Sequence, residues 1–142
     1  MEIKIERAKT LKEKPNQDNL GFGNYFTDHM FMNGLIQKEQ DGMNARIVPY
    51  APIPMDPATM VLHYAQETFE GLKAYRDPNG NITLFRPEMN ARRMINSNRR
   101  ICMAELPEEM FVEAVETIVK YEQDWIPTAK DTSLYNSSIH VC

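Results

Sequence analysis

The chain has 142 residues, which is room for one domain or for a fragment of a larger protein, and its 42% hydrophobic and 25% charged residues are typical of a globular protein. No apolar run approaches the roughly 20 residues that a membrane-crossing helix needs, so no membrane partner is expected. Twenty acidic residues against sixteen basic ones give a formal charge of −4, which argues against general affinity for nucleic acid.

Residues 1–19 are predicted to form a flexible arm. The segment is polar, and the stretch from Lys12 to Asn19 has too few apolar side chains to offset the entropy that is lost on ordering. Its first residues contain no apolar signal-peptide core, so a cytoplasmic location is expected.

The next part of the chain is predicted to form strands. Apolar residues at 30–32 and the run 46–50 each predict a strand, with a turn at Gln40–Gly42 between them. The pair Asp56–Pro57 is typical of a helix start, because a capping acid precedes a proline, and it predicts a short helical turn before Val61.

Alternating side chains predict a hairpin in the middle of the chain. Residues 72–76 and 82–85 alternate between the two faces of a strand, and the turn residues Asp77–Gly80 separate them. Arg86–Glu88 follows with a proline and an acid, which predicts a helix that ends before Pro107. The apolar residues expected to face inward from this helix are Met89, Met94 and Ile95.

A second helix is predicted from apolar residues that recur at one- and four-residue steps, and it should stop near Trp125–Pro127. A closing strand is expected to begin at Ser133–Tyr135 and to be cut off almost at once. Strands and helices mixed without a βαβ alternation predict an α+β domain over residues 20–135, with an antiparallel sheet and packed helices. The apolar residues of the second helix are Met110, Phe111, Ala114, Val115, Ile118 and Val119.

The usual catalytic and metal-binding signatures are absent. The chain has no glycine-rich nucleotide loop, no nucleophile elbow and no zinc-protease motif, and its two cysteines lie far apart. The histidines at 29, 63 and 140 are scattered, so we interpret them as hydrogen-bonded structural groups and expect no metal.

Four arginines share one predicted helix, where a seven-residue step places Arg92 with Arg99 and Arg93 with Arg100 on common faces. A guanidinium fork matches the oxygens of a phosphate group. Spacing alone favours solvated surface charges over a phosphate site. An RNA-binding face would also need interleaved aromatic residues, which this helix lacks.

The run VLHYAQETFEGLKAYR at 61–76 closely resembles the signature of branched-chain amino acid aminotransferases, which are class IV, fold-type IV enzymes that depend on pyridoxal 5'-phosphate. Further runs resemble this family in the same order along the chain. They are LGFG at 20–23, YFTDHM at 25–30, LFRPEMNARRM at 84–94, RRICM at 99–103, DWIP at 124–127 and TSLY at 132–135.

The resemblance implies a small α+β domain that packs on a larger domain, with the cofactor between them. Arg93 matches the family's anchor for the cofactor phosphate. Phe22, Tyr64, Phe69 and Tyr135 match aromatic positions of the substrate pocket, although packing in the core would explain each of them without the resemblance. In the family, the tyrosine at the position of Tyr64 reaches the pocket of a neighbouring subunit, which implies a homodimer.

The implied activity transfers the amino group of leucine, isoleucine or valine to 2-oxoglutarate. The family's cofactor-binding lysine belongs to the larger domain, which this chain does not match, and Lys73 does not stand at that position. We therefore assign no catalytic residue here and expect the isolated chain to be inactive.

Residues 136–142 depart from the family pattern and are interpreted as a tail outside it. Ser137 stands where the family has an arginine that binds a carboxylate, and a neutral hydroxyl cannot form that charged pair. An alternative function is a non-catalytic interaction domain that forms mixed dimers with a full-length aminotransferase.

Overall fold

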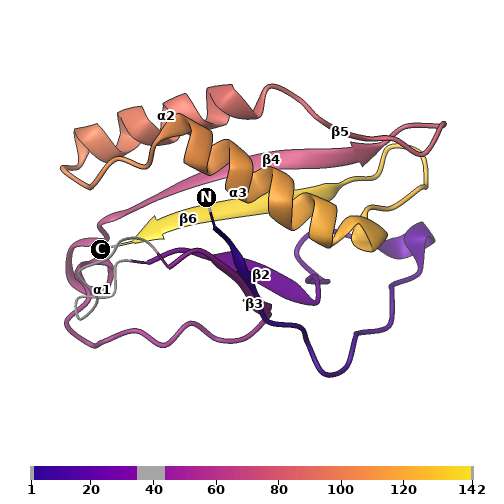
Figure 1. The fold of residues 1–142 in the computed structure, drawn as a ribbon, viewed down its shortest axis with the longest axis horizontal. Coiled ribbons are helices and arrows are strands. Elements are labelled where there is room, and N and C mark those ends of the chain that lie inside the picture. The colour runs from indigo at the N-terminus through magenta and orange to yellow at the C-terminus, as the bar shows by residue number, and fades with distance from the viewer. Residues whose placement is uncertain (1, 35–43, 142) are drawn as a thin grey trace.

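Two three-stranded sheets and two long helices make up the described part of the chain (Figure 1). The structure is a computed structural model, and it describes residues 2–34 and 44–141. The turn expected at Gln40–Gly42 lies outside the described residues. Mixed strands and helices confirm the α+β class. None of the helices within the described ranges is long and apolar enough to cross a bilayer.

The smaller sheet has the strand order β1-β3-β2. Strands β2 (His29–Met32) and β3 (Arg46–Pro49) are antiparallel, with Phe31 opposite Ile47, and they confirm the two strands predicted in this region. Strand β1 (Lys4–Ile5) pairs in parallel with β3. Ile47, on the central strand, is completely buried.

The larger sheet has the order β5-β4-β6, and both of its pairings are antiparallel. Strands β4 (Glu67–Arg76) and β5 (Ile82–Leu84) confirm the predicted hairpin, and the Gly80 N–H donates to the Asp77 carbonyl at 2.9 Å in the turn. Strand β4 starts before the alternation that predicted it. Its first half pairs with β6 alone, because β5 pairs only with the last three residues of β4.

The prediction that the closing strand is cut off near Tyr135 is wrong. Strand β6 (Leu134–Val141) runs on for eight residues and pairs with β4 along its whole length. The half-buried face of this strand carries polar side chains, so no hydrophobic alternation indicates it. Its backbone groups still complete the hydrogen-bond ladder with β4, so residues 136–141 belong to the sheet.

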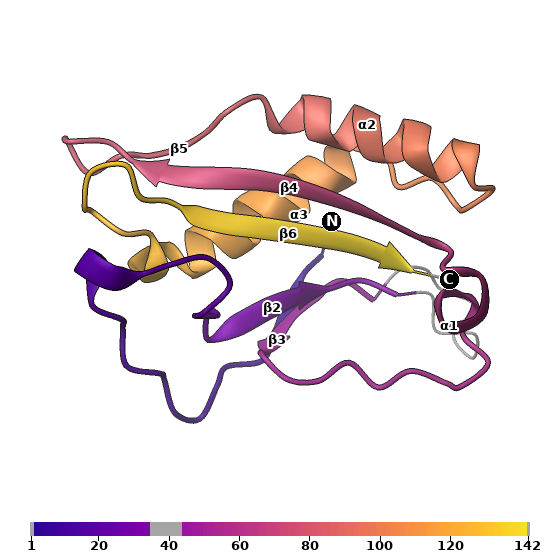
Figure 2. The ribbon, with the colours of Figure 1, turned by 180° about the vertical axis from the view of Figure 1, so that it is seen from behind.

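Helices α2 (Pro87–Arg100) and α3 (Glu108–Tyr121) cover one face of the larger sheet. Seen from behind, in Figure 2, no helix lies in front of β4 and β6. Phe69, Lys73 and Ser137 on this face are exposed, and we call it the open face. The core between sheet and helices consists of Leu72, Ala74, Ala91, Met94, Phe111, Val115, Val119 and Ile126.

Two details of the helices differ from the predictions. Met89 is 42% exposed instead of inward-facing, because the buried stripe of α2 contains Ala91 and Met94, and Met89 lies far around the helix from both. Helix α3 ends at Tyr121, and a separate 3-10 turn, η2 (Gln123–Trp125), follows it.

The connection before β4 contains a short helix, α1 (Met60–Tyr64). The Asp56 carboxylate accepts a hydrogen bond from the Ala58 N–H at 2.8 Å, so this acid caps a turn that lies upstream of the helix. Helix α1 therefore includes Val61, whereas the sequence predicted a helical turn before it. It lies beside the C-terminal end of β6 in both ribbon views.

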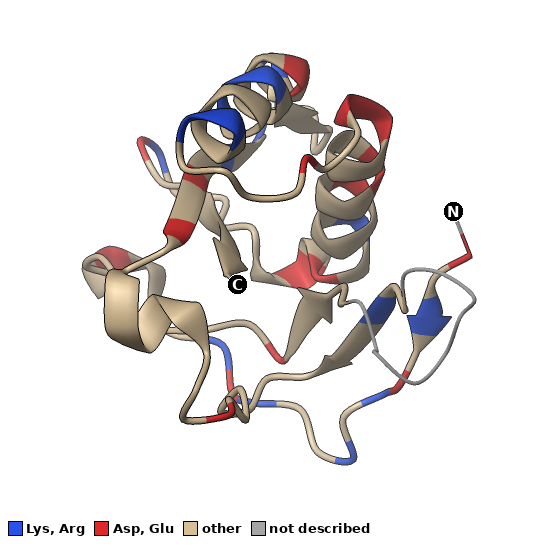
Figure 3. Ribbon diagram, turned by 90° about the vertical axis from the view of Figure 1, so that its left-hand side faces the viewer, with Lys and Arg blue, Asp and Glu red and all other residues tan. Residues whose placement is uncertain are grey.

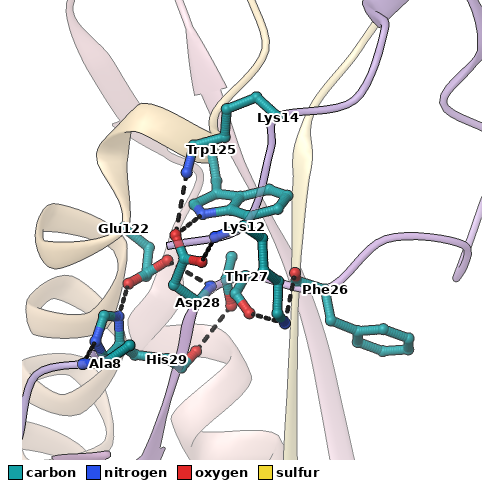
Figure 4. Close-up of polar contacts among 9 residues, drawn as sticks. All are labelled: Ala8, Lys12, Lys14, Phe26, Thr27, Asp28, His29, Glu122 and Trp125. Carbon is teal, nitrogen blue, oxygen red and sulfur yellow. Dashed lines mark hydrogen bonds and ion pairs between the residues drawn. The ribbon is translucent and has the colours of Figure 1, made fainter. Parts of the chain in front are cut away.

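The N-terminal segment, expected to be a flexible arm, lies against the two sheets. Besides β1 it contains a 3-10 turn, η1 (Gln17–Asn19), and the Gln17 side chain accepts hydrogen bonds from the Thr128 and Ala129 N–H groups. The Asp28 carboxylate accepts bonds from the Lys12 N–H at 2.7 Å and from Lys14 Nζ at 3.1 Å (Figure 4). These contacts are made by backbone N–H groups, the Gln17 amide and the Lys14 ammonium group, and the composition of the segment does not predict such contacts.

A buried polar network joins this segment to the end of α3 (Figure 4). The Glu122 carboxylate accepts a hydrogen bond from the Asp28 N–H at 3.0 Å and lies 2.5 Å from His29 Nδ1. His29 Nε2 accepts from the Ala8 N–H at 2.8 Å, so the proton of the neutral ring is on Nδ1. Both nitrogens have partners, which confirms the structural interpretation of this histidine.

Candidate functional site

Three of the four arginines on α2 are held by carboxylates. Arg92 donates two hydrogen bonds to Glu108, and Arg99 donates two to Glu105, on the exposed side of the helix. These acids raise the pKa of each partner arginine, and the arginines in turn lower the pKa of the two carboxyl groups. Figure 3 shows the basic positions gathered along α2.

Arg93 is the exception, because its partner comes from the sheet. Its Nε lies 2.5 Å from Glu70 Oε1, and its Nη2 lies 2.7 Å from Glu70 Oε2. The Glu70 side chain is 3% exposed, and it also accepts a bond from Asn90 Nδ2 at 2.9 Å. Hydrogen bonding to this carboxylate raises the pKa of Arg93. The pair leaves Nη1 of Arg93 without a protein partner among the described residues.

An open groove of about 510 Å³ lies between the free edge of β4 and helix α2. Arg93 and Phe69 both line it, so two of the residues singled out from the sequence meet at one site. The groove exists because β5 pairs only with the far end of β4 and leaves the edge near Phe69 uncovered. Its lining residues are Glu67, Thr68, Phe69, Arg93, Asn96, Ser97, Arg100 and Ile101.

Two further residues singled out from the sequence meet at the open face of the larger sheet: Tyr135 belongs to β6, and Phe22 comes from the segment between η1 and β2. The rings of Phe22 and Tyr135 meet edge to face, with centroids 5.2 Å apart. A methyl group added at Gly71 would overlap the hydroxyl and ring of Tyr135, so the glycine makes room for this ring over β4. Phe69 lies two residues along the same face of β4 and is 66% exposed.

Tyr64 lies apart from these aromatic residues. It is 74% exposed and lines a separate recess with Met60, Ala65, Gln66 and Ile101. Ile101 also lines the groove, so the two hollows are neighbours. The structure therefore joins Arg93 with Phe69 and Phe22 with Tyr135, and it leaves Tyr64 exposed at the end of α1.

Lys73 and Ser137 both lie on the open face of the sheet. Lys73 is opposite Tyr135 in the ladder, and Ser137 is opposite Gly71. Neither residue lines the groove, and no lysine is among the residues that do. The described residues of the groove therefore supply no amine that could hold an aldehyde.

Sequence reasoning missed Glu70, which positions Arg93. A signal was present, because Glu70 shares the period-two alternation of Leu72 and Ala74 and so falls on the buried face of its strand. A carboxylate at such a position needs a charged or hydrogen-bonding partner. An arginine on the covering helix is the natural candidate.

The groove has the donors that a phosphate monoester requires. Nη1 of Arg93 remains available, and Arg100 lines the same groove. Guanidinium groups match phosphate oxygens in geometry and in charge. The exposed ring of Phe69 adds an apolar wall beside them. This combination fits the phosphate end of a cofactor and supplies no covalent attachment.

Comparison with known proteins gives several close relatives and no matching family model. "Branched-chain-amino-acid transaminase 1" of Bacillus subtilis is 48% identical over 136 residues, which cover 92% of this chain and 37% of that protein. "Branched-chain-amino-acid aminotransferase 2" of the same species is 45% identical over 133 residues, 94% of this chain and 36% of the relative. "Branched-chain-amino-acid aminotransferase" of Mycolicibacterium smegmatis is 48% identical over 118 residues, 82% of this chain and 32% of the relative. The chain thus spans about a third of the length of the curated relatives it matches.

Proposed function

We propose that this chain, a homologue of the branched-chain-amino-acid aminotransferases, supplies the N-terminal part of an enzyme that moves the amino group of leucine, isoleucine or valine to 2-oxoglutarate with pyridoxal 5'-phosphate. The observation that carries the proposal is the groove in which Arg93 and Phe69 meet. When bound, the cofactor would supply the chemistry that carries the amino group from one substrate to the other.

In this proposal Arg93 holds the cofactor phosphate through Nη1. The bidentate pair with Glu70 fixes the plane of the guanidinium group, so Arg93 loses little further freedom when an anion binds. Asn90 fixes Glu70 in turn. A preorganised donor of this kind binds more tightly than a free surface arginine.

The aromatic residues Phe22, Phe69 and Tyr135 bind the aliphatic side chain of the substrate. Complete removal of a valine, leucine or isoleucine side chain from water contributes about 1.5–3 kcal/mol. Aromatic rings offer that surface without unpaired polar groups. The exposure of Phe22 and Phe69 leaves their rings available for such a contact.

We further propose that the active assembly is a homodimer in which Tyr64 reaches the site of the partner subunit. The side chain of Tyr64 is largely exposed and is not among the residues packed in the core cluster of its own chain. An exposed aromatic residue at the end of a short helix suits an intersubunit contact.

A chimera tests the proposal. Residues 1–135 of this chain replace the corresponding part of Bacillus subtilis branched-chain-amino-acid transaminase 1, and leucine-dependent formation of glutamate from 2-oxoglutarate is measured. We expect an active chimera that loses activity when Arg93→Gln is combined with Glu70→Gln, a change that leaves no unpaired buried charge. The matched control is Arg92→Gln, which faces Glu108 on the exposed side.

The isolated chain provides the complementary result. We expect no turnover of leucine by the pure chain, because none of the lysines that the structure describes lines the groove to hold the cofactor. A folded chimera with no activity would contradict the proposed function. Activity of the pure chain that disappears with Lys73→Ala would contradict the proposal that this chain does not supply the cofactor-binding lysine.

A further inference from the structure

The charges on α2 are not equivalent. Arg92, Arg93 and Arg99 each form a two-bond pair with one carboxylate, so each of these pairs has no net charge. Arg100 has neither a hydrogen bond nor an ion pair within residues 2–34 and 44–141. It is therefore the one arginine of this helix whose positive charge is not balanced by a neighbour in the part of the chain that the structure describes.

Arg100 also lies on the same face of α2 as Arg93, where both side chains could reach one anion. It lies seven residues after Arg93, which is about two helical turns, or about 10.5 Å along the axis at 1.5 Å per residue. Both side chains therefore extend from the same face of α2, and both line the groove beside β4. The long side chain of Arg100 can extend along this span toward the guanidinium group of Arg93, which Glu70 holds in place.

We propose that Arg100 is the second cation of the groove and that a phosphate monoester binds between it and Nη1 of Arg93. The inference rests on the proposed function, and it assigns the binding of the phosphate to two guanidinium groups. Arg93 supplies a fixed donor, and Arg100 supplies a positive charge that forms no ion pair among the described residues, in a groove that the Glu67 carboxylate also lines.

The charge of a phosphate monoester is the reason that a second guanidinium group is needed beside Arg93. A phosphate monoester carries between one and two negative charges at neutral pH. At Nη1 of Arg93 it would face a guanidinium whose charge Glu70 already offsets. The C-terminal end of α2, where Arg100 lies, also carries a partial negative charge from its free carbonyl groups, which disfavours an anion. The positive charge of Arg100 acts against both effects and against the Glu67 carboxylate that lines the same groove.

The test uses the pure chain and a probe without an aldehyde, so that surface lysines cannot react with it. Pyridoxine 5'-phosphate is titrated into 15N-labelled chain at low salt, and affinity is read from amide and arginine Nε chemical shifts. We expect Arg100→Gln to weaken binding by about tenfold, the effect of losing one charge-assisted hydrogen bond. The matched control, Arg99→Gln, removes the neighbouring charge, which pairs with Glu105 away from the groove, and should change affinity by less than about twofold.

Two further measurements separate the possible failures. Pyridoxine, which lacks the phosphate, should bind the wild type and Arg100→Gln equally weakly. If Arg100→Gln binds the phosphate probe like Arg99→Gln while the pair Arg93→Gln and Glu70→Gln loses binding, the role of Arg100 is wrong and the proposed function stands. If wild type does not distinguish pyridoxine 5'-phosphate from pyridoxine at millimolar concentrations, both the inference and the cofactor role of Arg93 are overturned.

Discussion

Asn98 and His140 meet beneath the larger sheet, where Nδ2 of the asparagine lies 2.9 Å from Nδ1 of the histidine. Asn98 is fully buried, and its Oδ1 accepts a bond from the Thr68 hydroxyl at 2.6 Å. Because the amide nitrogen donates, Nδ1 of His140 must accept and carries no proton. Burial lowers the pKa of His140, which favours the same neutral form.

Removal of the histidine side chain should therefore destabilise the fold. His140→Ala leaves one N–H of the buried Asn98 amide without its acceptor, and an unsatisfied buried donor costs about 1–3 kcal/mol. The free energy of unfolding is measured by urea denaturation. Ser137→Ala, on the open face of the same strand, is the matched control and should change it by less than about 0.5 kcal/mol. Equal changes in the free energy of unfolding for the two variants would contradict a stabilising role of the contact between Asn98 and His140.

The stability of the chain should fall when the pH drops below about 6.5, the ordinary pKa of histidine. Because the pKa of His140 is lowered in the folded state, the unfolded chain binds the proton more readily, and protonation favours unfolding. The loss continues until the pH reaches the pKa of the folded state. His140→Gln should flatten this part of the profile, measured as the urea midpoint from pH 7.5 to 5. An unchanged slope in the variant would contradict the assignment.

Asp28 should control a second loss of stability at lower pH. Burial raises the pKa of this carboxyl group, but hydrogen bonds from the Lys12 N–H, Trp125 and Lys14 outweigh burial and bring it below 3.8. The stabilisation is present above pH 3.8 and is lost as the pH falls through the lowered pKa. Asp28→Asn should cost about 1–3 kcal/mol at pH 7. Fluorescence of Trp125, the single tryptophan, reports the transition directly.

In that experiment the variant and the wild type should become equally stable in strong acid, where the carboxyl group of the wild type is neutral as well. Asp56→Asn provides the matched control, because Asp56 caps an exposed turn. A constant difference between Asp28→Asn and wild type down to pH 2 would mean that the charge of Asp28 plays no part.

Gly71→Ala should displace Tyr135 from its position over β4. The added methyl group overlaps the hydroxyl and ring of this tyrosine, and overpacking of this kind costs about 1–3 kcal/mol unless the side chain swings away. The measurement is the nuclear Overhauser contact between the Phe22 and Tyr135 rings, which should weaken or vanish. Gly34→Ala is the control, since nothing lies within 4 Å of the added atom there. A retained ring contact would contradict the close approach.

Periodicity predicted the elements that bury apolar side chains. Helix α3 and strands β4 and β5 show a clear hydrophobic periodicity in the sequence, because one face of each lies against the core. Strand β6 shows no such periodicity, since its half-buried residues include Asn136, Ser138 and His140.

The attachment of the N-terminal segment to the rest of the fold could not be predicted from the sequence either. It is attached through the Lys12 backbone and the Lys14 ammonium group to Asp28, and no apolar pattern accompanies such contacts. The resemblance to a family pointed to Arg93 and Phe69, which line one groove in the structure. The division between paired and unpaired arginines depends on where the fold places Glu70, Glu105 and Glu108, which the spacing of the arginines does not indicate.

The antiparallel ladder between β4 and β6 makes the spacing before β6 critical. His140 faces the helices and Ile139 faces the open side because Leu134 is paired with Ala74. One residue added to or lost from the connection after η2 would shift that pairing by one position and exchange the two faces. An added residue would place Ile139 beside the Asn98 amide in place of the histidine, and a lost residue would place Val141 there. The chain can tolerate substitutions in this connection far better than a change in its length.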